Sequence, residues 1–176
     1  NVLVKIDYSS LNFKDALILN NGGKIIRKYP FIPGIDFSGR VEESEDSKFK
    51  KNDKVILTGF RVGEMYFGGF SQYAKVNSDF LVKTPNDLNN LKVMKMGTAG
   101  LTALLCAFAV KAKEELLMGS KVKDVLVTGA TGGVGSFAIM ALSKMGYDVH
   151  AVTGKKEKHE YLKKLGAKNI LDRNQF

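Results

Sequence analysis

The segment that most restricts the fold of this chain is a glycine-rich loop, which reads Gly129-Ala130-Thr131-Gly132-Gly133-Val134-Gly135. An apolar run over 124–128 precedes it and predicts a strand covered on both faces, as in parallel sheets. The residues over 133–145 then have the apolar spacing of a helix. A strand, a tight glycine turn and a helix in this order are typical of the first part of a parallel α/β unit.

The C-terminal part of the chain continues the same alternation. Its pattern predicts a strand over 148–153, a helix over 157–165 and a strand over 169–171. Together with the elements on either side of the glycine loop, these give the order βαβαβ. The sequence therefore predicts an α/β fold with a doubly wound parallel sheet, the Rossmann type, for this part.

A glycine loop at the start of such a helix is suited to binding the pyrophosphate of a dinucleotide. Gly132 lets the backbone approach the ligand, Gly135 lets the helix pack closely on the strand, and free N–H groups at the helix start favour an anion. Ala130 stands where the usual pattern has its first glycine. By itself the loop also fits an ordinary strand-to-helix turn, so the βαβαβ context carries the prediction.

The end of the second strand of this part favours NADP(H) over NAD(H). It reads Thr153-Gly154-Lys155-Lys156, where NAD enzymes usually have an Asp or Glu for the ribose hydroxyl. A carboxylate would repel a 2'-phosphate, whereas a hydroxyl and ammonium groups bind one. The alternative is that the two lysines only begin a solvated helix. Lysines oppose the dipole at a helix N-terminus, however, and a bound anion would offset them.

Residues 1–85 have a different sequence pattern, which predicts mainly β-strands. Alternating runs between turn residues predict strands over 1–8, 35–43, 54–58, 70–76 and 80–84, and one helix is predicted over 12–19. A helical region follows, with Asp87 as its N-cap candidate, a break around Gly97 to Gly100 and an end at Gly119. We therefore expect a domain boundary between 86 and 97.

Composition narrows the class of protein. The 176 residues include a single cysteine, so neither a disulfide framework nor a multi-cysteine metal cluster is expected, and a reducing cytoplasm fits best. Cys106 lies in an apolar run and is expected to be a small buried side chain. No uninterrupted apolar stretch has the roughly 20 residues of a membrane span. The net charge of +9 is spread along the chain, so no specific nucleic-acid partner is expected.

Several separate stretches resemble the medium-chain dehydrogenase/reductase superfamily, in its zinc-independent quinone oxidoreductase branch and the acrylyl-CoA reductase group. The resemblance spans essentially the whole chain and rests on these motifs together with the glycine loop: Ser9-Ser10-Leu11-Asn12-Phe13-Lys14-Asp15-Ala16-Leu17, Pro33-Gly34-Ile35-Asp36-Phe37-Ser38-Gly39, Gly68-Gly69-Phe70-Ser71-Gln72-Tyr73 and Gly97-Thr98-Ala99-Gly100-Leu101-Thr102-Ala103.

The resemblance implies two domains. A GroES-like β-barrel domain that holds substrate is expected over 1–96, without its N-terminal strand or strands, and the first half of an NADP-binding Rossmann domain over 97–176. Zinc-dependent relatives have a Cys in the first motif and a His-Glu pair in the second. Here Asn12 to Asp15 and Ile35-Asp36 stand there, so no metal site is expected.

The resemblance also implies which residues contact cofactor and substrate. The expected cofactor contacts are Phe13, Thr131, Gly132, Gly133, Val134, Thr153, Gly154, Lys155 and Arg173. The closest family members have Tyr at the position of Phe13, so a phenol hydroxyl is lost there. The expected reaction is hydride transfer from NADPH to an activated C=C bond of an acrylyl-CoA-like thioester, or to an enone or a quinone. Asn12 and Asp15 are the catalytic candidates, with N-capping the alternative role for Asn12.

Arg61 is a candidate contact for an anionic substrate such as a CoA phosphate, although a lone loop arginine is more often solvated. A homodimer is expected at full length. Only 41 residues follow Gly135 (176 minus 135), so we expect half of the cofactor site and no complete active site in this chain.

Two other functions fit part of the pattern. The glycine loop also matches that of short-chain dehydrogenases, but more than a hundred residues precede it and no tyrosine is followed four residues later by lysine. An NADP-responsive binding module, including an RNA binder, is the non-enzymatic alternative. A salt-dependent RNA titration separates it from an enzyme, because binding abolished by modest salt is only nonspecific attraction.

Overall fold

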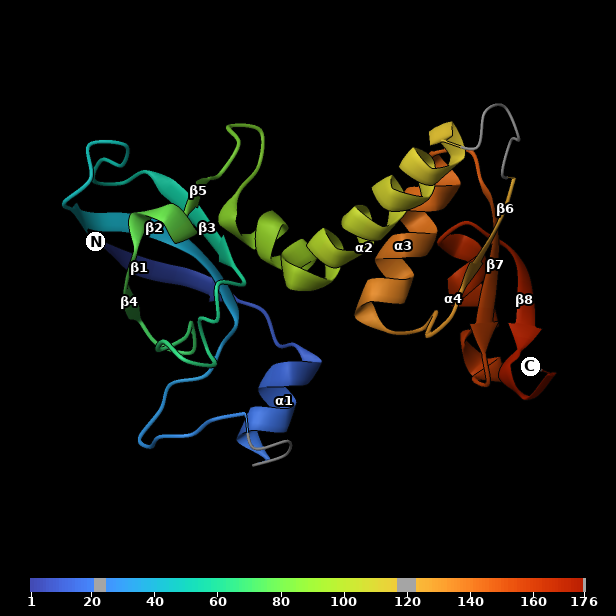
Figure 1. The fold of residues 1–176 in the computed structure, drawn as a ribbon, viewed down its shortest axis with the longest axis horizontal. Helices are drawn as coiled ribbons and strands as arrows, with labels where there is room; N and C mark the ends of the chain where they lie inside the picture. Colours follow the sequence, from blue (N-terminus) through green and yellow to red (C-terminus); the bar gives the residue numbers. More distant parts are fainter. Residues whose placement is uncertain (21–24, 117–122, 176) are drawn as a thin grey trace. The chain divides into compact units, whose positions relative to one another are not determined.

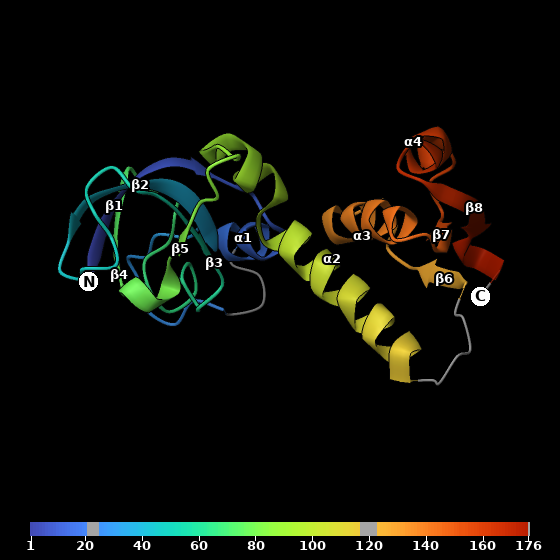
Figure 2. The ribbon, with the colours of Figure 1, turned by 90° about the horizontal axis from the view of Figure 1, so that it is seen from above.

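The computed structural model describes residues 1–20, 25–116 and 123–175. The chain forms two compact units, Asn1–Thr98 and Ala99–Phe176. Figures 1 and 2 show a mainly β unit and an α/β unit. The turn signal at Gly22-Gly23 and the predicted helix end at Gly119 lie outside the described residues.

The first unit is built on a five-stranded antiparallel sheet with the order β4-β1-β2-β3-β5 (Figure 1). The strands are β1 (Val2–Ser9), β2 (Asp36–Ser44), β3 (Lys54–Thr58), β4 (Tyr73–Val76) and β5 (Val82–Lys83). All five predicted strands are therefore confirmed, but the last two are shorter than predicted. The fourth starts late because the N–H groups of Gly69 and Phe70 donate to the carbonyls of Gly34 and Pro33 instead of to a strand.

The core of the first unit follows from the alternation that predicted the strands. Val2 and Val4 of β1 and Phe37 of β2 are fully buried. They pack with Val41, Phe49, Val55, Leu57, Val62, Ala74, Val76 and Leu81 in one cluster. The side chains that alternate with them along β1 are less buried, as expected for a sheet with one covered face.

The helices α1 (Phe13–Leu19) and α2 (Asn90–Leu116) and the 3-10 helix η1 (Ser78–Phe80) complete the elements of this part of the chain. The predicted N-cap of α2 at Asp87 is wrong. The cap is Asn89, whose Oδ1 accepts from the N–H of Lys92 at 2.9 Å. The N–H of Leu88 donates to the carbonyl of Pro85, which closes a turn before the helix and delays its start.

A break inside α2 divides the helix at the boundary between the units. Gly97 has φ 47° and ψ −153°, so the residues on its two sides form separate helices. A side chain at this position would place its Cβ 2.8 Å from Asp36 Oδ2 and 2.8 Å from Ser10 Oγ. The predicted break is confirmed, and it needs glycine for both backbone conformation and space.

The second unit contains a three-stranded parallel sheet with the order β6-β7-β8. Its further elements are β6 (Asp124–Val127), α3 (Gly133–Lys144), β7 (Asp148–Thr153), η2 (Lys156–Lys158), α4 (His159–Lys164), β8 (Ala167–Asp172) and η3 (Arg173–Gln175). The βαβαβ prediction is confirmed. The last strand is longer than predicted because Ala167, Asn169 and Asp172 all pair with β7.

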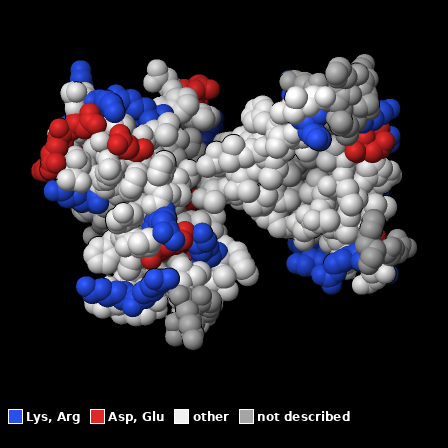
Figure 3. All heavy atoms as spheres, in the orientation of Figure 1, with Lys and Arg blue, Asp and Glu red and all other residues white. Residues whose placement is uncertain are grey.

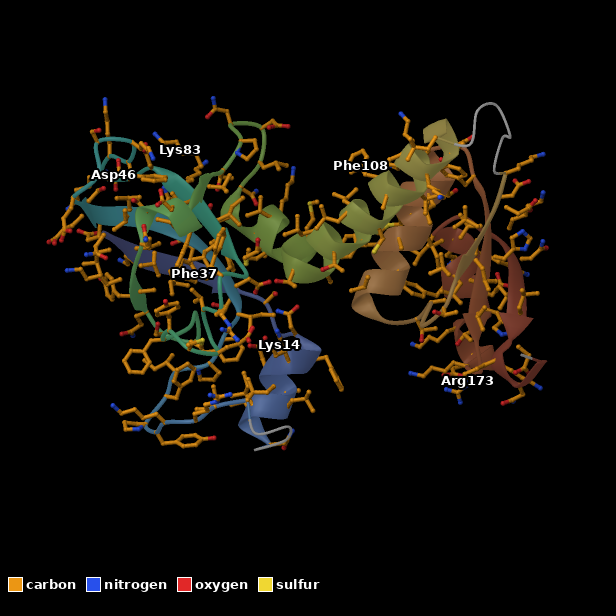
Figure 4. The ribbon with its side chains drawn as sticks, in the orientation of Figure 1. Lys14, Phe37, Asp46, Lys83, Phe108 and Arg173 are labelled. Atoms are coloured by element: carbon orange, nitrogen blue, oxygen red, sulfur yellow. The ribbon has the colours of Figure 1, made fainter. Side chains whose placement is uncertain are left out.

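The core of the second unit lies between the sheet and its helices. Ile139 of α3, Val149 of β7 and Leu162 of α4 are fully buried there, together with Ala103 and Ala107 of α2. Cys106, which directly precedes Ala107 in α2, is exposed. The expectation that it is buried is wrong, because it lies on a face of the helix that the described chain leaves uncovered, along with Leu105 and Phe108 (Figure 4).

One helix among the described residues, Asn90–Glu114, is long and apolar enough to cross a membrane by length and composition. This differs from the expectation that no stretch has that length, because a few charged residues are compatible with a span. Core helices of soluble proteins meet the same criteria. Here Gly97 interrupts the helix, and Glu114 near its end accepts a hydrogen bond from the Tyr147 hydroxyl at 2.6 Å.

Replacing Gly97 by alanine tests the role of the break. We expect Gly97→Ala to lower the free energy of unfolding by more than about 1 kcal/mol, because it adds backbone strain and a clash with the Asp36 carboxylate. Gly59→Ala is the matched control, since Gly59 has φ 85° but nothing within 4 Å of an added Cβ. Equal losses in the two variants, measured by urea unfolding, would show that the contact with Asp36 contributes nothing.

A second prediction concerns the ion pairs that join strand ends in the second unit. Asp148 Oδ2 accepts from Lys168 Nζ at 2.6 Å and lies 3.5 Å from Lys123 Nζ. The hydrogen bond from Lys168, helped by both ammonium charges, lowers the pKa of the Asp148 carboxyl from its ordinary value of 3.8.

A carboxyl with a lowered folded-state pKa adds stability that is present above its unfolded-state value and is lost as the pH falls through the folded-state value. The difference in unfolding free energy between the unsubstituted protein and Asp148→Asn should therefore be constant above about pH 4 and shrink below it. Denaturant unfolding at a series of pH values measures this. A difference that does not change with pH contradicts the prediction.

Candidate functional site

A buried carboxylate in the first unit gathers the polar residues of the first two motifs. Asp36, the first residue of β2, has no exposed surface. Its Oδ1 accepts from Ser10 Oγ at 2.6 Å and from the Ser10 N–H at 3.3 Å. Its Oδ2 accepts from the N–H of Thr98 at 2.8 Å. The carboxylate therefore joins the end of β1, the start of β2 and the break in α2 at one point.

Asn12 completes this polar cluster. Its Nδ2 donates to Ser10 Oγ at 3.0 Å and lies 3.4 Å from both oxygens of Asp36. Asn12 is also the N-cap residue of α1, so the alternative role foreseen for it is present. The amide nitrogen faces Ser10 and Asp36, and the side-chain oxygen forms the capping box with the backbone N–H of Asp15. The acceptor that Asn12 has left for a ligand is therefore the second lone pair of Oδ1.

Asp15 is buried and bound to the backbone. Its Oδ2 accepts from the Asn12 N–H at 2.9 Å, and its Oδ1 accepts from the N–H groups of Gly34 and Ile35 at 3.2 and 3.0 Å. Its side chain has no exposed surface. This position holds the start of α1 against the segment before β2, and it gives Asp15 no access to solvent.

Phe13 and Lys14 lie on the outer side of α1. Phe13 is 80% exposed, so its ring is open to a stacking partner. Lys14 Nζ donates to Glu64 Oε1 at 2.8 Å, which links α1 to the loop that contains Glu64 (Figure 4). One short helix thus brings together Asn12, Phe13 and Asp15. Their environments differ, because Phe13 is exposed and Asp15 is buried.

Asp36 is the residue of this cluster that the sequence analysis did not single out. There it appeared only as the residue at a zinc-ligand position of other proteins. A charged residue between two apolar ones, Ile35 and Phe37, at the head of a strand was the available signal, because a buried charge needs several donors. Among the described residues no group of three or more His, Cys, Asp and Glu could hold a metal ion.

The glycine loop of the second unit forms the predicted strand-to-helix turn. Gly129 has φ 59°, and its carbonyl accepts from the N–H of Gly132 at 2.9 Å. A Cβ on Gly135 would overlap the Gly129 carbonyl, so the close packing of α3 on the loop requires glycine there. The packing role that the sequence assigns to Gly135 is therefore visible in the backbone, and the structure adds Gly129 as the turn residue.

The start of α3 has the properties of an anion site. Gly132 is its N-cap, and no side chain of the described residues caps the helix. The first N–H groups of a helix have no partner within the helix, so those at Gly133 and Val134 are available to a ligand. Gly132, Gly133 and Val134 are exposed, and Thr131 is partly exposed.

The predicted 2'-phosphate residues come together at the carboxyl ends of β7 and β8. Thr153 Oγ1 accepts from the N–H of Lys155 at 3.1 Å. The guanidinium of Arg173 lies over Gly154, with Nε 3.8 Å from the position of an added Cβ. Figure 4 shows Arg173 at that end of the sheet. Because β6 and β7 are adjacent and parallel, the glycine loop lies at this same edge.

Comparison with known proteins agrees with both units. Residues 1–86 match the alcohol dehydrogenase GroES-like domain family. The chain is 49% identical over 175 residues to the acrylyl-CoA reductase AcuI of Ruegeria pomeroyi, covering 99% of this chain and 52% of that protein. The chain thus spans about half the length of the curated relatives it matches.

Solved structures with the same fold include some with a bound dinucleotide. The yhdH oxidoreductase from Salmonella enterica in complex with NADP superposes with a TM-score of 0.93 at 49% identity, over 100% of this chain and 53% of that one. The Bacillus subtilis protein yhfP with NAD bound gives 0.87 at 45% identity, over 99% and 52%. The chain belongs to the medium-chain dehydrogenase/reductase superfamily, in the group of quinone oxidoreductases and acrylyl-CoA reductases.

Proposed function

We propose that the whole protein is an NADPH-dependent, zinc-independent reductase of an activated C=C bond, with an acrylyl-CoA-like thioester as its substrate class and quinones as the second. The observation that carries the proposal is the arrangement at the carboxyl edge of β6-β7-β8, where an uncapped helix start and the Thr153–Arg173 group lie at one edge. The identity to an acrylyl-CoA reductase over the whole chain supports the substrate class.

The second unit binds the adenosine side of the cofactor in this proposal. Thr131 to Val134 receive the pyrophosphate, and Thr153, Gly154, Lys155 and Arg173 receive the 2'-phosphate. Two cations and a hydroxyl suit a dianionic phosphate, and an arginine fork binds it through two hydrogen bonds. One relative was crystallised with NAD. The preference of this protein for NADP(H) over NAD(H) is therefore tested below by kinetics with both dinucleotides.

The first unit supplies the residues next to the reacting atoms. Bound NADPH supplies the hydride. Phe13 offers an exposed ring for stacking, without the proton of a tyrosine. Asn12 offers the second lone pair of Oδ1 as a fixed acceptor that orients substrate or cofactor, because the capping box and the contacts of its amide nitrogen with Ser10 and Asp36 hold the side chain. Asp15 acts by positioning α1 rather than by contact.

The location and assembly of the protein belong to the same proposal. A cytoplasmic location fits the single cysteine and a cofactor that is reduced inside cells. A homodimer at full length would cover apolar surface such as the face of α2 with Leu105 and Phe108. The direct test of the activity is NADPH oxidation by the full-length protein with acrylyl-CoA and a quinone compared side by side.

Removal of the cationic side chains tests the cofactor preference. We expect Lys155→Ala and Arg173→Ala each to raise the KM for NADPH about tenfold, as for a lost charge-assisted hydrogen bond, and to leave the KM for NADH within about twofold. Lys164→Ala is the control, because Lys164 is an exposed lysine of the neighbouring α4. Equal rises for the two dinucleotides would contradict a role at the 2'-phosphate.

A change at Asn12 tests the first unit. We expect Asn12→Ala to lower kcat at least tenfold, about 1.4 kcal/mol of barrier, while the dissociation constant for NADPH stays within about threefold. Asn12→Ser keeps a hydroxyl cap and controls for loss of helix stability. Asn20→Ala, at the other end of α1, is the matched control and should leave kcat unchanged. Full activity in folded Asn12→Ala protein would refute the assignment.

A further inference from the structure

A pocket in the first unit lies next to this site and has no role in the preceding proposal. It has a volume of about 720 Å³ and is lined by the segment 25–31 and the loop 61–67. Its walls carry Arg27, Lys28, Tyr29, Phe31, Arg61 and Phe67. A pocket of this size accommodates a ligand as large as a nucleotide.

The pocket has an excess of positive charge. Arg27, Lys28 and Arg61 are exposed, and within the described part of the chain none of the three forms an ion pair. The acidic residue of the lining, Glu64, is paired with Lys14 at 2.8 Å. Figure 3 shows Lys and Arg side chains gathered over the lower part of the first unit as drawn. Three unpaired cations around one pocket suit a ligand with several phosphate charges.

The same pocket has exposed aromatic side chains in its lining. Tyr29 is 62% exposed and Phe67 60% exposed. The ring of Phe31 packs against Phe67 with centroids 5.6 Å apart and an interplanar angle of 59°. Exposed rings of this kind provide a face for a purine base, and stacking of a base on an aromatic ring contributes to binding.

The loop fixes Arg61 in a backbone conformation that a side chain rarely adopts. Phe60 and Arg61 have φ values of 53° and 61°. The Arg61 carbonyl accepts from the N–H groups of Glu64, Met65 and Tyr66. The Phe60 ring stacks on Phe80 with a centroid distance of 4.7 Å. Left-handed conformations at two adjacent non-glycine residues are strained, and strain that is held by surrounding contacts is concentrated at ligand sites.

The pocket wall is attached to the helix of the candidate site. Glu64 binds Lys14, the neighbour of Phe13, on α1. Gly34, which follows the segment 25–31 closely, donates to the Asp15 carboxylate of the same helix. A ligand seated here is therefore next to the residues that the proposed function places at the reacting atoms.

We propose that this pocket binds the phosphorylated adenosine end of an acyl-CoA substrate, with Arg27, Lys28 and Arg61 on its phosphates and the aromatic side chains against its base. The proposal rests on the proposed function and deepens it, because it selects a nucleotide-bearing thioester over a quinone. NADPH shares this chemistry, but its adenosine end already has a separate set of residues in the second unit.

Steady-state kinetics of the full-length protein with NADPH and acrylyl-CoA tests the pocket. Arg61→Ala keeps a Cβ at the strained position, so the loop backbone is under the same strain before and after the change. We expect Arg61→Ala and the double variant Arg27→Ala/Lys28→Ala each to raise the KM for acrylyl-CoA about tenfold or more. Turnover of a small enone without a nucleotide should stay within about twofold, as should the KM for NADPH.

The matched control is the double variant Lys50→Ala/Lys51→Ala, two adjacent exposed lysines outside the pocket. It should leave every KM unchanged, since exposed ion pairs such as Lys51–Glu42 contribute little. An unchanged KM for acrylyl-CoA in both pocket variants would overturn the proposal. So would an equal rise for the small enone, or a rise for NADPH instead.

Calorimetric titration with CoA and with dephospho-CoA separates this proposal from the proposed function. Tighter binding of CoA than of dephospho-CoA, reduced in Arg61→Ala, supports the pocket even if the protein proves inactive as a reductase. Binding of CoA that is the same in the unsubstituted protein and in both pocket variants refutes the pocket even if the protein is an active reductase.

Discussion

The buried carboxylate of Asp36 is the interaction on which the first unit depends. A charge without contact with water costs several kcal/mol unless several donors surround it. Here the donors are the backbone and hydroxyl of Ser10, the amide of Asn12 and the N–H of Thr98. Because those donors come from two segments that are far apart in the sequence, residues 10–12 and residue 98, meeting this one requirement fixes the end of β1, the start of α1 and the break in α2 against β2. Gly97 has no side chain because the carboxylate occupies the space where one would be.

The two units place their functional charged and polar groups differently, buried in the first unit and exposed in the second. The first unit encloses its carboxylates, Asp15 and Asp36, and uses backbone N–H groups to hold them, so their function is to fix neighbouring groups. The second unit leaves its donors open: the N–H groups at the start of α3, Lys155 and Arg173 are at the surface and face a common edge of the sheet. Enclosed acceptors give a rigid position for Asn12 and Phe13, and open donors give a site for phosphates. The pocket around Arg61 belongs to the first unit, but its cationic side chains are exposed like those of the second unit.

Most of the fold could be predicted from local pattern. The five antiparallel strands and the βαβαβ order follow from alternation and glycine position, which are properties of neighbouring residues. The errors came where hydrogen bonds or burial that the residue pattern does not show decided the outcome. The fourth strand starts late because Gly69 and Phe70 bind the segment at Pro33 and Gly34, and α2 starts at Asn90 because the turn closed by Leu88 precedes it. Cys106 is exposed because burial depends on which face of a helix is covered, and an apolar run does not reveal that.

The sequence by itself determined the family, the two kinds of unit and the glycine loop, because each is a matter of residue type at a fixed spacing. It also named Asn12, Phe13 and Asp15 as one motif. Only the tertiary structure decided what each of these does with its atoms. It turned the Asn12 amide nitrogen toward Asp36, bound Asp15 to the backbone of Gly34 and Ile35, exposed the Phe13 ring and placed Arg173 over Gly154. These outcomes depend on donors and acceptors far apart in the chain, and hydrogen bonds of that kind exist only once the backbone has brought their partners within about 3 Å.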